Sequence, residues 1–598
     1  MNKLISLSFI LLSIQALAQS PARIHGELKQ WHKVTLDFEG PEVSETDDYN
    51  PFFNYRLTVA FKHSSGKTCV VPGYFAADGN AGNTSASSGN TWRAHFSPDL
   101  TGEWSYSVDF RKGRWVAVSE RANPGIPGEF MDGATGSFEV TSTDKTGRDF
   151  RAKGRLSYVG EHYLQFEGTR EYFLKQGPDA PENLLSYVDF DGTFHNDGHK
   201  DHLVKSWEAH EKDWSEGDPT WQQGKGKAII GAMNYLASKG LNVVSFLTLN
   251  IMGDDQNVFP YIDYDTYDRF DVSKLDQWEI VFDHAQRLGI FLHFKTQEHE
   301  NQGLLDNGGV GAFRKLYYRE LIARFGHHLA LNWNMGEESG DWVKNHKTPP
   351  QFQQEFLAMA EYFYAHDPYH HHIVIHNGSK TLYDDILVPG SKYTGPSLQT
   401  TKRDFSRVHD FVLEWRNKSS KAGKKWAVAL DEPGDAQHSL LPDVEDAKHD
   451  TARANALWGA MMAGAWGVEW YFGYKHDHSD LTCQDYRSRD LFWDQCKIAL
   501  DYFNTLPFIE MAPADGVLST EDYCFAKKGE KYVVYLRFGG ATTLDLVGVN
   551  GEFEGKWFNP RTGNFHKRSF KITGGKKVDL SAPKKENDRD WVIELIKI

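Results

Sequence analysis

The sequence predicts a multidomain chain with three successive parts: a β-sandwich, a (β/α)8 TIM barrel and a small C-terminal β-sandwich. Its 598 residues exceed the usual size of one domain, so several domains are expected. Residues 21–145 form short segments of alternating apolar and polar residues, residues 150–505 alternate strand-like and helix-like segments, and residues 506–598 return to short strands. These patterns are typical of a sandwich, a barrel and a second sandwich.

Residues 1–18 are predicted to be a signal peptide. Lys3 precedes an apolar stretch that runs to about Ala16, and Ala16-Leu17-Ala18 is the small-x-small pattern cleaved by signal peptidase. We therefore expect export to the periplasm or the medium, with Gln19 as the mature N-terminus. No later apolar run approaches the roughly 20 residues of a membrane helix, so no membrane partner is expected.

Composition excludes some partners and permits others. The chain has 82 Asp and Glu against 66 Lys and Arg, which makes nucleic acid an unsuitable partner because phosphate binding needs clustered positive charge. Aromatic residues make up 14%, and their flat faces suit sugar rings as well as protein cores. Four cysteines are too few for a disulfide framework; Cys483 and Cys496 could pair, and the pairing stays open.

An Ig-like antiparallel sandwich is predicted for residues 21–145. Period-two alternation marks the strands, and turns rich in Gly, Asn, Asp and Pro separate them. Three of the strands read YRLTVAFKH at 55–63, WRAHFSPD at 92–99 and EWSYSVDF at 103–110. A sandwich of about a hundred residues accommodates this pattern.

Eight strand-and-helix units follow, which is the repeat of a (β/α)8 barrel. Apolar runs such as NVVSFL are typical of a sheet that is covered on both faces. The predicted strands cover residues 172–177, 242–250, 290–296, 329–335, 372–377, 393–399, 426–432 and 467–474. Short strands such as KYVVYLRF and DWVIELIKI then predict the C-terminal β-domain at 506–598.

Pairs of carboxylates end two of the predicted barrel strands. Glu337 and Glu338 end the fourth strand, and Asp431 and Glu432 end the seventh. Such acids can cap the helices that follow. However, the carboxyl ends of barrel strands meet at one mouth, and retaining glycoside hydrolysis needs two carboxyl groups about 5–5.5 Å apart. The positions therefore favour a two-carboxylate glycosidase.

The stretch WNMGEE resembles the strand-four motif Trp-x-x-x-Asn-Glu of clan GH-A glycoside hydrolases. The resemblance implies that Glu338 is the general acid/base and Glu432 the nucleophile, with Asp431 as a substitute for Glu432. The Asn that normally binds the sugar 2-hydroxyl is replaced by Glu337. Either Glu337 accepts that hydrogen bond as a substrate-binding residue, or Glu337 itself is the acid.

A wider resemblance covers nearly all of the mature chain. VPGYFAADGNA and HFSPDLTGEWSY resemble the N-terminal β-sandwich module of uncharacterised glycosidase-like proteins of Bacteroidetes, and FLKQGPDAPENLLSY and GVEWYFGY resemble their barrel, which is related to apiosidase-like hydrolases. WFNPRTG is similar to a C-terminal β-domain sometimes called collagen-binding. That name describes a similarity and is little evidence that this chain binds collagen.

Other polar and aromatic residues at the predicted strand ends are candidates for sugar subsites. A sugar site needs hydrogen-bonding groups for hydroxyls and a ring that stacks on the sugar. The candidates besides Glu337 are Asp179, Asn250, His299, His376 and Trp470.

No cofactor and no metal are expected. The His-rich stretches at 195–202, 370–372 and 475–480 lack the His-Glu-x-x-His spacing of a zinc site. The leading hypothesis is an exported glycoside hydrolase that degrades a plant or algal polysaccharide or its oligosaccharides. A non-catalytic glycan-binding or adhesion protein on the same scaffold is the alternative, and a metal-dependent hydrolase is a weaker third. Sugar, linkage and oligomeric state stay open.

Overall fold

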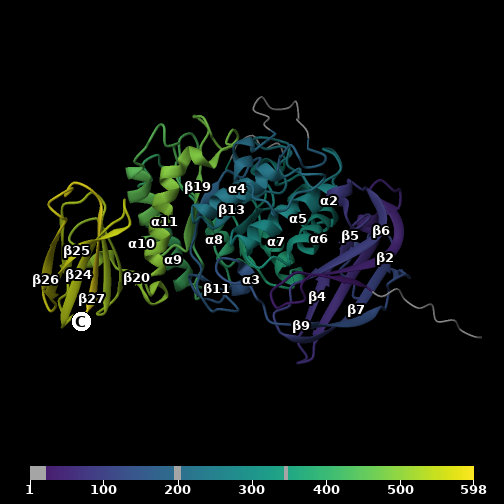
Figure 1. The fold of residues 1–598 in the computed structure, drawn as a ribbon, viewed down its shortest axis with the longest axis horizontal. Coiled ribbons are helices and arrows are strands. Elements are labelled where there is room, and N and C mark those ends of the chain that lie inside the picture. Colours follow the sequence, from purple (N-terminus) through teal and green to yellow (C-terminus); the bar gives the residue numbers. More distant parts are fainter. Residues whose placement is uncertain (1–21, 194–203, 343–347) are drawn as a thin grey trace, which may run out of the picture.

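The computed structural model describes residues 22–193, 204–342 and 348–598. An N-terminal β-sandwich, a central part that mixes strands and helices, and a C-terminal β-domain follow one another along the long axis (Figure 1). The predicted signal peptide, residues 1–18, lies outside the described residues. Within them, no helix has the length and apolarity that crossing a bilayer requires.

The N-terminal part consists of two antiparallel sheets, with strand orders β1-β2-β6-β5 and β4-β3-β7-β8, and β9 also pairs with β7. Alternate residues of β3 point into the core, where the ring of Phe61 stacks on Phe96 of the other sheet at 4.2 Å between centroids. The elements are β1 (Arg23–His25), β2 (Val34–Ser44), α1 (Pro51–Asn54), β3 (Tyr55–His63), β4 (Thr68–Pro72), β5 (Tyr74–Phe75), α2 (Ala81–Thr84), β6 (Ser88–Phe96), β7 (Gly102–Lys112), β8 (Ile126–Pro127) and β9 (Thr135–Val140).

The central part contains eight strands in two parallel four-stranded sheets, β13-β14-β15-β16 and β12-β19-β18-β17. The sheets meet at both seams: Asn242 N donates to Gln176 O at 3.0 Å, and His376 forms a parallel bridge with Ser397. We call this closed arrangement the strand ring. Its strands are β12 (Lys175–Asp179), β13 (Val243–Leu247), β14 (Phe291–Lys295), β15 (Leu331–Asn334), β16 (His372–Val374), β17 (Ser397–Gln399), β18 (Ala429–Glu432) and β19 (Gly467–Tyr471).

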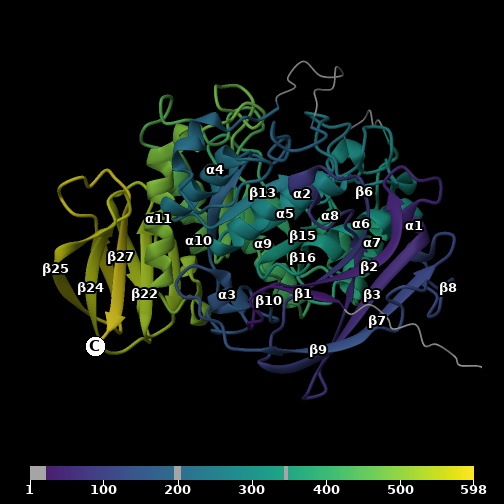
Figure 2. The same cartoon turned by 45° about the vertical axis from the view of Figure 1, so that its right-hand side comes forward.

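A helix follows each strand of the ring along the chain. In α5, Asp271 caps the N-terminus by accepting from Lys274 N at 2.9 Å, and Phe282 stacks on Phe246 of β13. The helices are α4 (Lys227–Ser238), α5 (Val272–Arg287), α6 (Ala312–Phe325), α7 (Gln353–His366), α8 (Leu382–Ile386), α9 (Val408–Lys421), α10 (Trp458–Met462) and α11 (Asp490–Asn504). Helices α5 and α6 lie on the side of the ring that faces the sandwich (Figure 2).

The C-terminal part has a six-stranded sheet, β20-β21-β22-β27-β24-β25, and a two-stranded sheet, β23-β26. One face of the larger sheet packs on the central part, where Tyr535 stacks on Trp458 of α10. The strands are β20 (Ala512–Pro513), β21 (Tyr523–Lys527), β22 (Lys531–Leu536), β23 (Ala541–Asp545), β24 (Glu552–Asn559), β25 (Asn564–Thr573), β26 (Lys577–Ser581) and β27 (Trp591–Lys597). Helix α3 (Phe150–Lys153) and strands β10 (Leu156–Tyr158) and β11 (Leu164–Phe166) join the sandwich to the ring.

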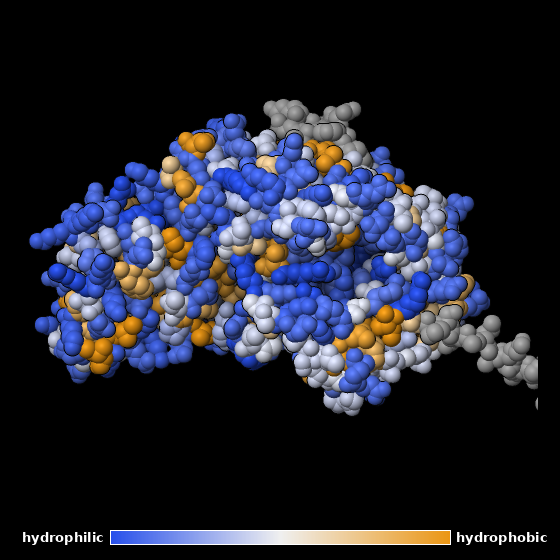
Figure 3. Space-filling model, viewed as in Figure 1, coloured by the Kyte–Doolittle hydropathy of each residue, from blue (hydrophilic) through white to orange (hydrophobic). Residues whose placement is uncertain are grey.

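The four cysteines are free thiols, and Cys483 and Cys496, whose pairing was left open, are both buried. Mostly hydrophilic residues cover the face seen in Figure 3, where apolar residues gather in separate groups.

Candidate active site

Two carboxylates from opposite sheets face each other at one end of the strand ring. Glu338 follows β15, and Glu432 is the last residue of β18. Gln399, at the end of β17, donates from Nε2 to Glu338 Oε1 at 2.5 Å and to Glu432 Oε1 at 2.8 Å. Two oxygens that bond one nitrogen cannot be farther apart than the sum of these distances. The two carboxylates therefore lie closer together than the roughly 6.5–9.5 Å of inverting glycosidases, and their spacing is compatible with retention.

The surroundings of Glu432 favour its ionised form. His376 is fully buried, and its Nε2 lies 3.0 Å from Glu432 Oε2. Burial opposes ionisation of Glu432, but the hydrogen bond and charge of His376, the charge of Lys295 and the hydrogen bond from Gln399 outweigh burial and lower the pKa of Glu432. A carboxylate that stays ionised in this way can act as a nucleophile.

The surroundings of Glu338 favour its protonated form. Burial, followed by the negative charge of Glu432, raises the pKa of Glu338 to about 8, against a lowering by the hydrogen bond from Gln399. The two carboxylates are thus driven apart in pKa, one toward a proton donor and one toward an anion. This division of roles is what a general acid and a nucleophile need.

The backbone at Glu338 has an unusual conformation. Its φ is 49°, in the left-handed region that costs a non-glycine residue on the order of 1 kcal/mol. The Glu338 carbonyl accepts hydrogen bonds from His299 Nδ1 at 2.8 Å and from the indole of Trp342. Trp342 is 46% exposed, so an open aromatic face lies next to the candidate acid.

Glu337 faces a different environment from its neighbour. Its Oε1 accepts from Lys295 Nζ at 2.6 Å, and the same ammonium donates to Asp179 Oδ1 at 2.9 Å. Ser245 also donates to Asp179 Oδ1. All four side chains are buried. Glu337 and Asp179 therefore share the Lys295 ammonium, whereas the Glu338 side chain bonds Gln399, which also bonds Glu432.

Deeper in the ring, a second buried cluster holds Asp431. Lys175 Nζ donates to Asp431 Oδ1 at 2.7 Å and also to Glu469. His293 Nδ1 donates to Glu469 Oε2 at 2.8 Å and accepts from Asn334 at Nε2. Asp431 is thus committed to Lys175, which leaves Glu432 as the acid of this pair that faces Glu338. Charged side chains occupy positions that apolar residues usually fill in a parallel strand ring.

The remaining sequence-predicted residues differ in their placement. Asn250 donates from Nδ2 to Glu182 Oε2 at 2.9 Å, beside Glu337. Trp470 is fully buried: its indole donates to Gln176 at 3.0 Å, and its ring meets Phe492 of α11 edge to face. The ring of Trp470 therefore has no open face for a sugar. The residues that the structure brings together are Glu338, Glu432, Glu337, Asp179, His299 and His376, with Asn250 at their edge.

Three residues of this site were missed in the sequence. Gln399 ends a predicted strand, so the strand-end argument applied to the other candidates could have found it. Lys295 is the one Lys, Arg, Asp or Glu in the largely apolar stretch IFLHFKT, which signals a buried partner. Trp342 stands four residues after Glu338, at the rim.

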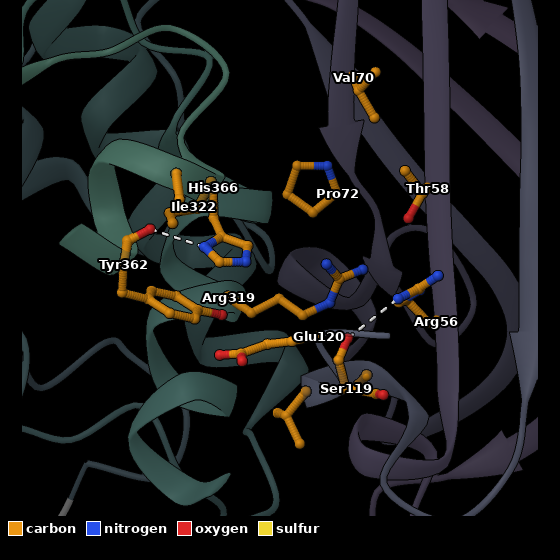
Figure 4. A pocket seen from close by; sticks show the side chains of 13 residues that line it. Arg56, Thr58, Val70, Pro72, Ser119, Glu120, Arg319, Ile322, Tyr362 and His366 are labelled. Atoms are coloured by element: carbon orange, nitrogen blue, oxygen red, sulfur yellow. Dashed lines mark hydrogen bonds between the residues drawn. The ribbon is translucent and has the colours of Figure 1, made fainter. Parts of the chain in front are cut away.

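Some His-rich stretches are structural. His371 Nδ1 bonds Asp367 Oδ2 at 2.8 Å, and His372 bonds Thr394. Residues 195–202 lie outside the described residues. Away from the mouth, a cavity of about 300 Å³ lies between the sandwich and helices α6 and α7, lined by residues that include Arg56, Arg319 and His366 (Figure 4). None of the strand-end acids lines it.

Comparison with known proteins supports the fold. Residues 27–111 match a family described as a domain of unknown function, and residues 514–596 match one described as a "putative collagen-binding domain of a collagenase". No curated protein matches the chain.

Among solved structures, one described as a "putative glycoside hydrolase" from Bacteroides vulgatus is similar over 95% of this chain and 99% of its own, with a TM-score of 0.62 and 16% identity. A family 5 glycoside hydrolase from the same organism covers 76% of this chain and 95% of its own, with a TM-score of 0.52 and 14% identity. Another glycoside hydrolase structure also has a TM-score of 0.52, with 16% identity over 76% of this chain and 99% of its own. The chain therefore has a multidomain, β-rich fold of the glycoside hydrolase kind.

Proposed function

We propose that the protein is an exported glycoside hydrolase that works by retention. The observation that carries this proposal is the pair Glu338 and Glu432, which are bridged by Gln399 and have pKa values shifted in opposite directions. The strand ring with its eight helices is, in this proposal, a (β/α)8 TIM barrel at 150–505. An Ig-like sandwich at 21–145 and a C-terminal β-sandwich at 506–598 flank it.

In the first step, Glu432 attacks the anomeric carbon and Glu338 gives its proton to the leaving oxygen. In the second step, Glu338 takes a proton from water, which attacks the same carbon and releases Glu432. His376 and Lys295 offset the negative charge of Glu432 before attack. Glu337 acts here as part of the buried Lys295 pair, which supports Glu338 rather than Glu337 as the acid.

The substrate is, in this proposal, a plant or algal polysaccharide or its oligosaccharides, and the chain belongs with apiosidase-like proteins of Bacteroidetes. The exposed ring of Trp342 beside the acid suits stacking on a sugar. The segment resemblances noted in the sequence support the family. The pattern of residues 1–18 supports a periplasmic or secreted location.

The decisive experiment measures reducing-sugar release from a panel of plant and algal polysaccharides and oligosaccharides. We expect Glu338→Gln and Glu432→Gln each to lower the rate by roughly a hundredfold or more. The matched control, Glu361→Gln, changes an exposed glutamate of α7 and should keep full activity. NMR of the first-formed product should show the anomeric configuration of the substrate.

If both variants still release reducing sugar at the native rate, Glu338 and Glu432 are not catalytic residues. If the product has the inverted anomeric configuration, Glu432 is not a nucleophile. The alternative function is a glycan-binding protein that has lost catalysis. The replacement of the expected Asn by Glu337 favours this alternative. Binding of a glycan in the panel without any hydrolysis would support it.

A further inference from the structure

Three glutamates from three strand ends converge beside the carboxylate pair. Glu182 follows β12, Glu298 follows β14 and Glu337 follows β15. One carboxylate oxygen of each lies within 4.8 Å of those of the other two, and the residues are only 4%, 6% and 4% exposed. Three buried carboxylates at this spacing repel one another unless protons or a counter-cation compensate them.

Parts of this cluster have no partner in the protein. Glu298 Oε2 and Glu337 Oε2 are buried without a hydrogen bond from any described residue. Outside the cluster, Asp480 is fully buried, and neither of its carboxylate oxygens has a partner among the described residues. The carboxylate oxygens in this region thus outnumber the hydrogen-bond donors that the described residues supply to them.

The nearby lysines are already engaged. Lys295 Nζ is held by Asp179 and by the other oxygen of Glu337. Lys205 Nζ donates to the backbone carbonyls of Leu481 at 2.8 Å and Cys483 at 2.9 Å. Within the described ranges, no Lys or Arg nitrogen lies within 4.0 Å of the carboxylate oxygens of Glu182 or Glu298.

We propose that Glu182, Glu298 and Glu337 bind a divalent cation that prefers oxygen ligands, with Ca²⁺ as the best fit. Ca²⁺ takes six to eight oxygens at about 2.3–2.6 Å, so ligands on opposite sides of one ion lie roughly 5 Å apart. Three oxygens within 4.8 Å of one another can therefore all reach a single ion. The cluster offers carboxylates without sulfur or imidazole, which favours Ca²⁺ over zinc or copper.

Such an ion would tie together the chain segments that follow three strands of the ring, β12, β14 and β15. Glu337 is adjacent in the chain to Glu338, whose backbone is held in the left-handed region. The cation therefore acts as a positioning element for the candidate acid, and its binding can be measured without any sugar. A protein that does not hydrolyse glycans could still bind the cation, and a protein that does not bind the cation could still be a hydrolase. The two experiments therefore test the two proposals separately.

The test is calorimetric titration of EDTA-treated full-length protein with Ca²⁺ alone at pH 7, together with thermal unfolding with and without Ca²⁺. We expect stoichiometric binding and a rise in Tm, since a ligand that binds only the folded state stabilises it. Glu298→Gln and Glu182→Gln should each weaken binding at least about tenfold. Glu361→Gln, on the surface of α7, should bind as the native protein does.

Two results would overturn the proposal. One is the absence of heat and of any Tm shift with Ca²⁺, Mg²⁺ or Mn²⁺ at millimolar concentration in the native protein, which needs no variant to fold. The other is binding that both Gln variants retain unchanged, because the ion would then lie elsewhere.

Discussion

At the scale of single residues, neighbours from other strands set the protonation of the two candidate catalytic carboxylates. Glu338 and Glu432 share the Gln399 amide, but only Glu432 lies against His376. Burial is the largest influence on both carboxyls and raises each pKa. For Glu338 the negative charge of Glu432 adds to burial, whereas for Glu432 the charges of His376 and Lys295 and the hydrogen bond from Gln399 outweigh it. The two pKa values therefore shift in opposite directions.

These shifts predict a bell-shaped pH dependence of kcat/KM. Activity needs Glu338 protonated, so it should fall as pH rises through about 8. It also needs Glu432 ionised, so it should fall on acidification through a pKa below the usual 4.5. Initial rates on the best substrate from pH 3 to 10 measure both limbs. A basic limb near pH 5 would contradict the assignment of Glu338.

Substitution of Gln399 by Ala should move both limbs to higher pH, because its hydrogen bonds lower the pKa of both carboxylates. We also expect a loss in kcat of roughly tenfold or more, since the carboxylates lose their common support. Gln353→Ala, at the exposed start of α7, is the matched control. If kcat falls but the acidic and basic limbs of the pH profile keep their pKa values, Gln399 contributes only to packing.

At the scale of elements, an ion cluster joins the sandwich to α5. Lys33, just before β2, contacts Glu279 Oε1 at 2.7 Å and Asp283 Oδ2 at 2.6 Å. Burial opposes ionisation of both acids, but the charges of Lys33, His327 and His328 together outweigh it and lower the pKa of each. His328 also contacts Glu279. The cluster therefore depends on Lys33 as its cation.

Substitution of Lys33 by Met should lower the free energy of unfolding by about 3 kcal/mol at pH 7, because two carboxylates lose their counter-charge. Groups with depressed pKa values stabilise the fold above their unfolded pKa, near 4, and this contribution is lost as pH falls through the folded pKa. The difference between native and variant should thus narrow from pH 6 to 3. Thermal unfolding measures it, with the exposed Lys62→Met of β3 as control. A gap that is independent of pH would indicate lost packing instead.

At the scale of the whole molecule, the C-terminal β-domain is attached by a polar cluster as well as by aromatic packing. Asp590 accepts from Arg453 Nε at 2.8 Å, from Arg561 Nη1 at 2.8 Å and from Tyr535 at 2.8 Å. Arg453 precedes α10 in the central part, whereas the other three residues belong to the C-terminal domain. Asp590 is 3% exposed, so its charge is shielded from water and depends on these partners.

Substitution of Asp590 by Asn should destabilise the protein by about 3–5 kcal/mol, because two arginines lose their shared anion. kcat/KM below the unfolding temperature should stay unchanged, since the cluster lies outside the proposed site. Chemical denaturation with parallel rate measurements checks both statements. Asp588→Asn, two residues earlier and exposed, is the control. A variant as stable as the native protein would show that aromatic packing alone holds the domain.

Local patterns account for much of the architecture. The period-two stretch at 55–63 coincides with β3 (Tyr55–His63), because its alternate residues meet core and solvent. The eight predicted central strands all occur, but some are shorter than predicted: 242–250 becomes β13 (Val243–Leu247). Strand β13 ends at Leu247, and the side chain of Asn250, which lies beyond it, bonds Glu182. Strand ends at a mouth are shaped by such side-chain contacts, which hydropathy does not encode.

The sequence by itself determined the order of strands and helices and placed acids at the ends of the fourth and seventh central strands. Both follow from local periodicity and from position along the chain. Only the tertiary structure decided which acid of each pair faces the other, because Lys295 and Lys175 hold Glu337 and Asp431 from other strands of the ring. It also turned Trp470 toward α11 and gathered three glutamates that are far apart in sequence. These outcomes depend on contacts between residues tens to hundreds of positions apart, which no local spacing reveals.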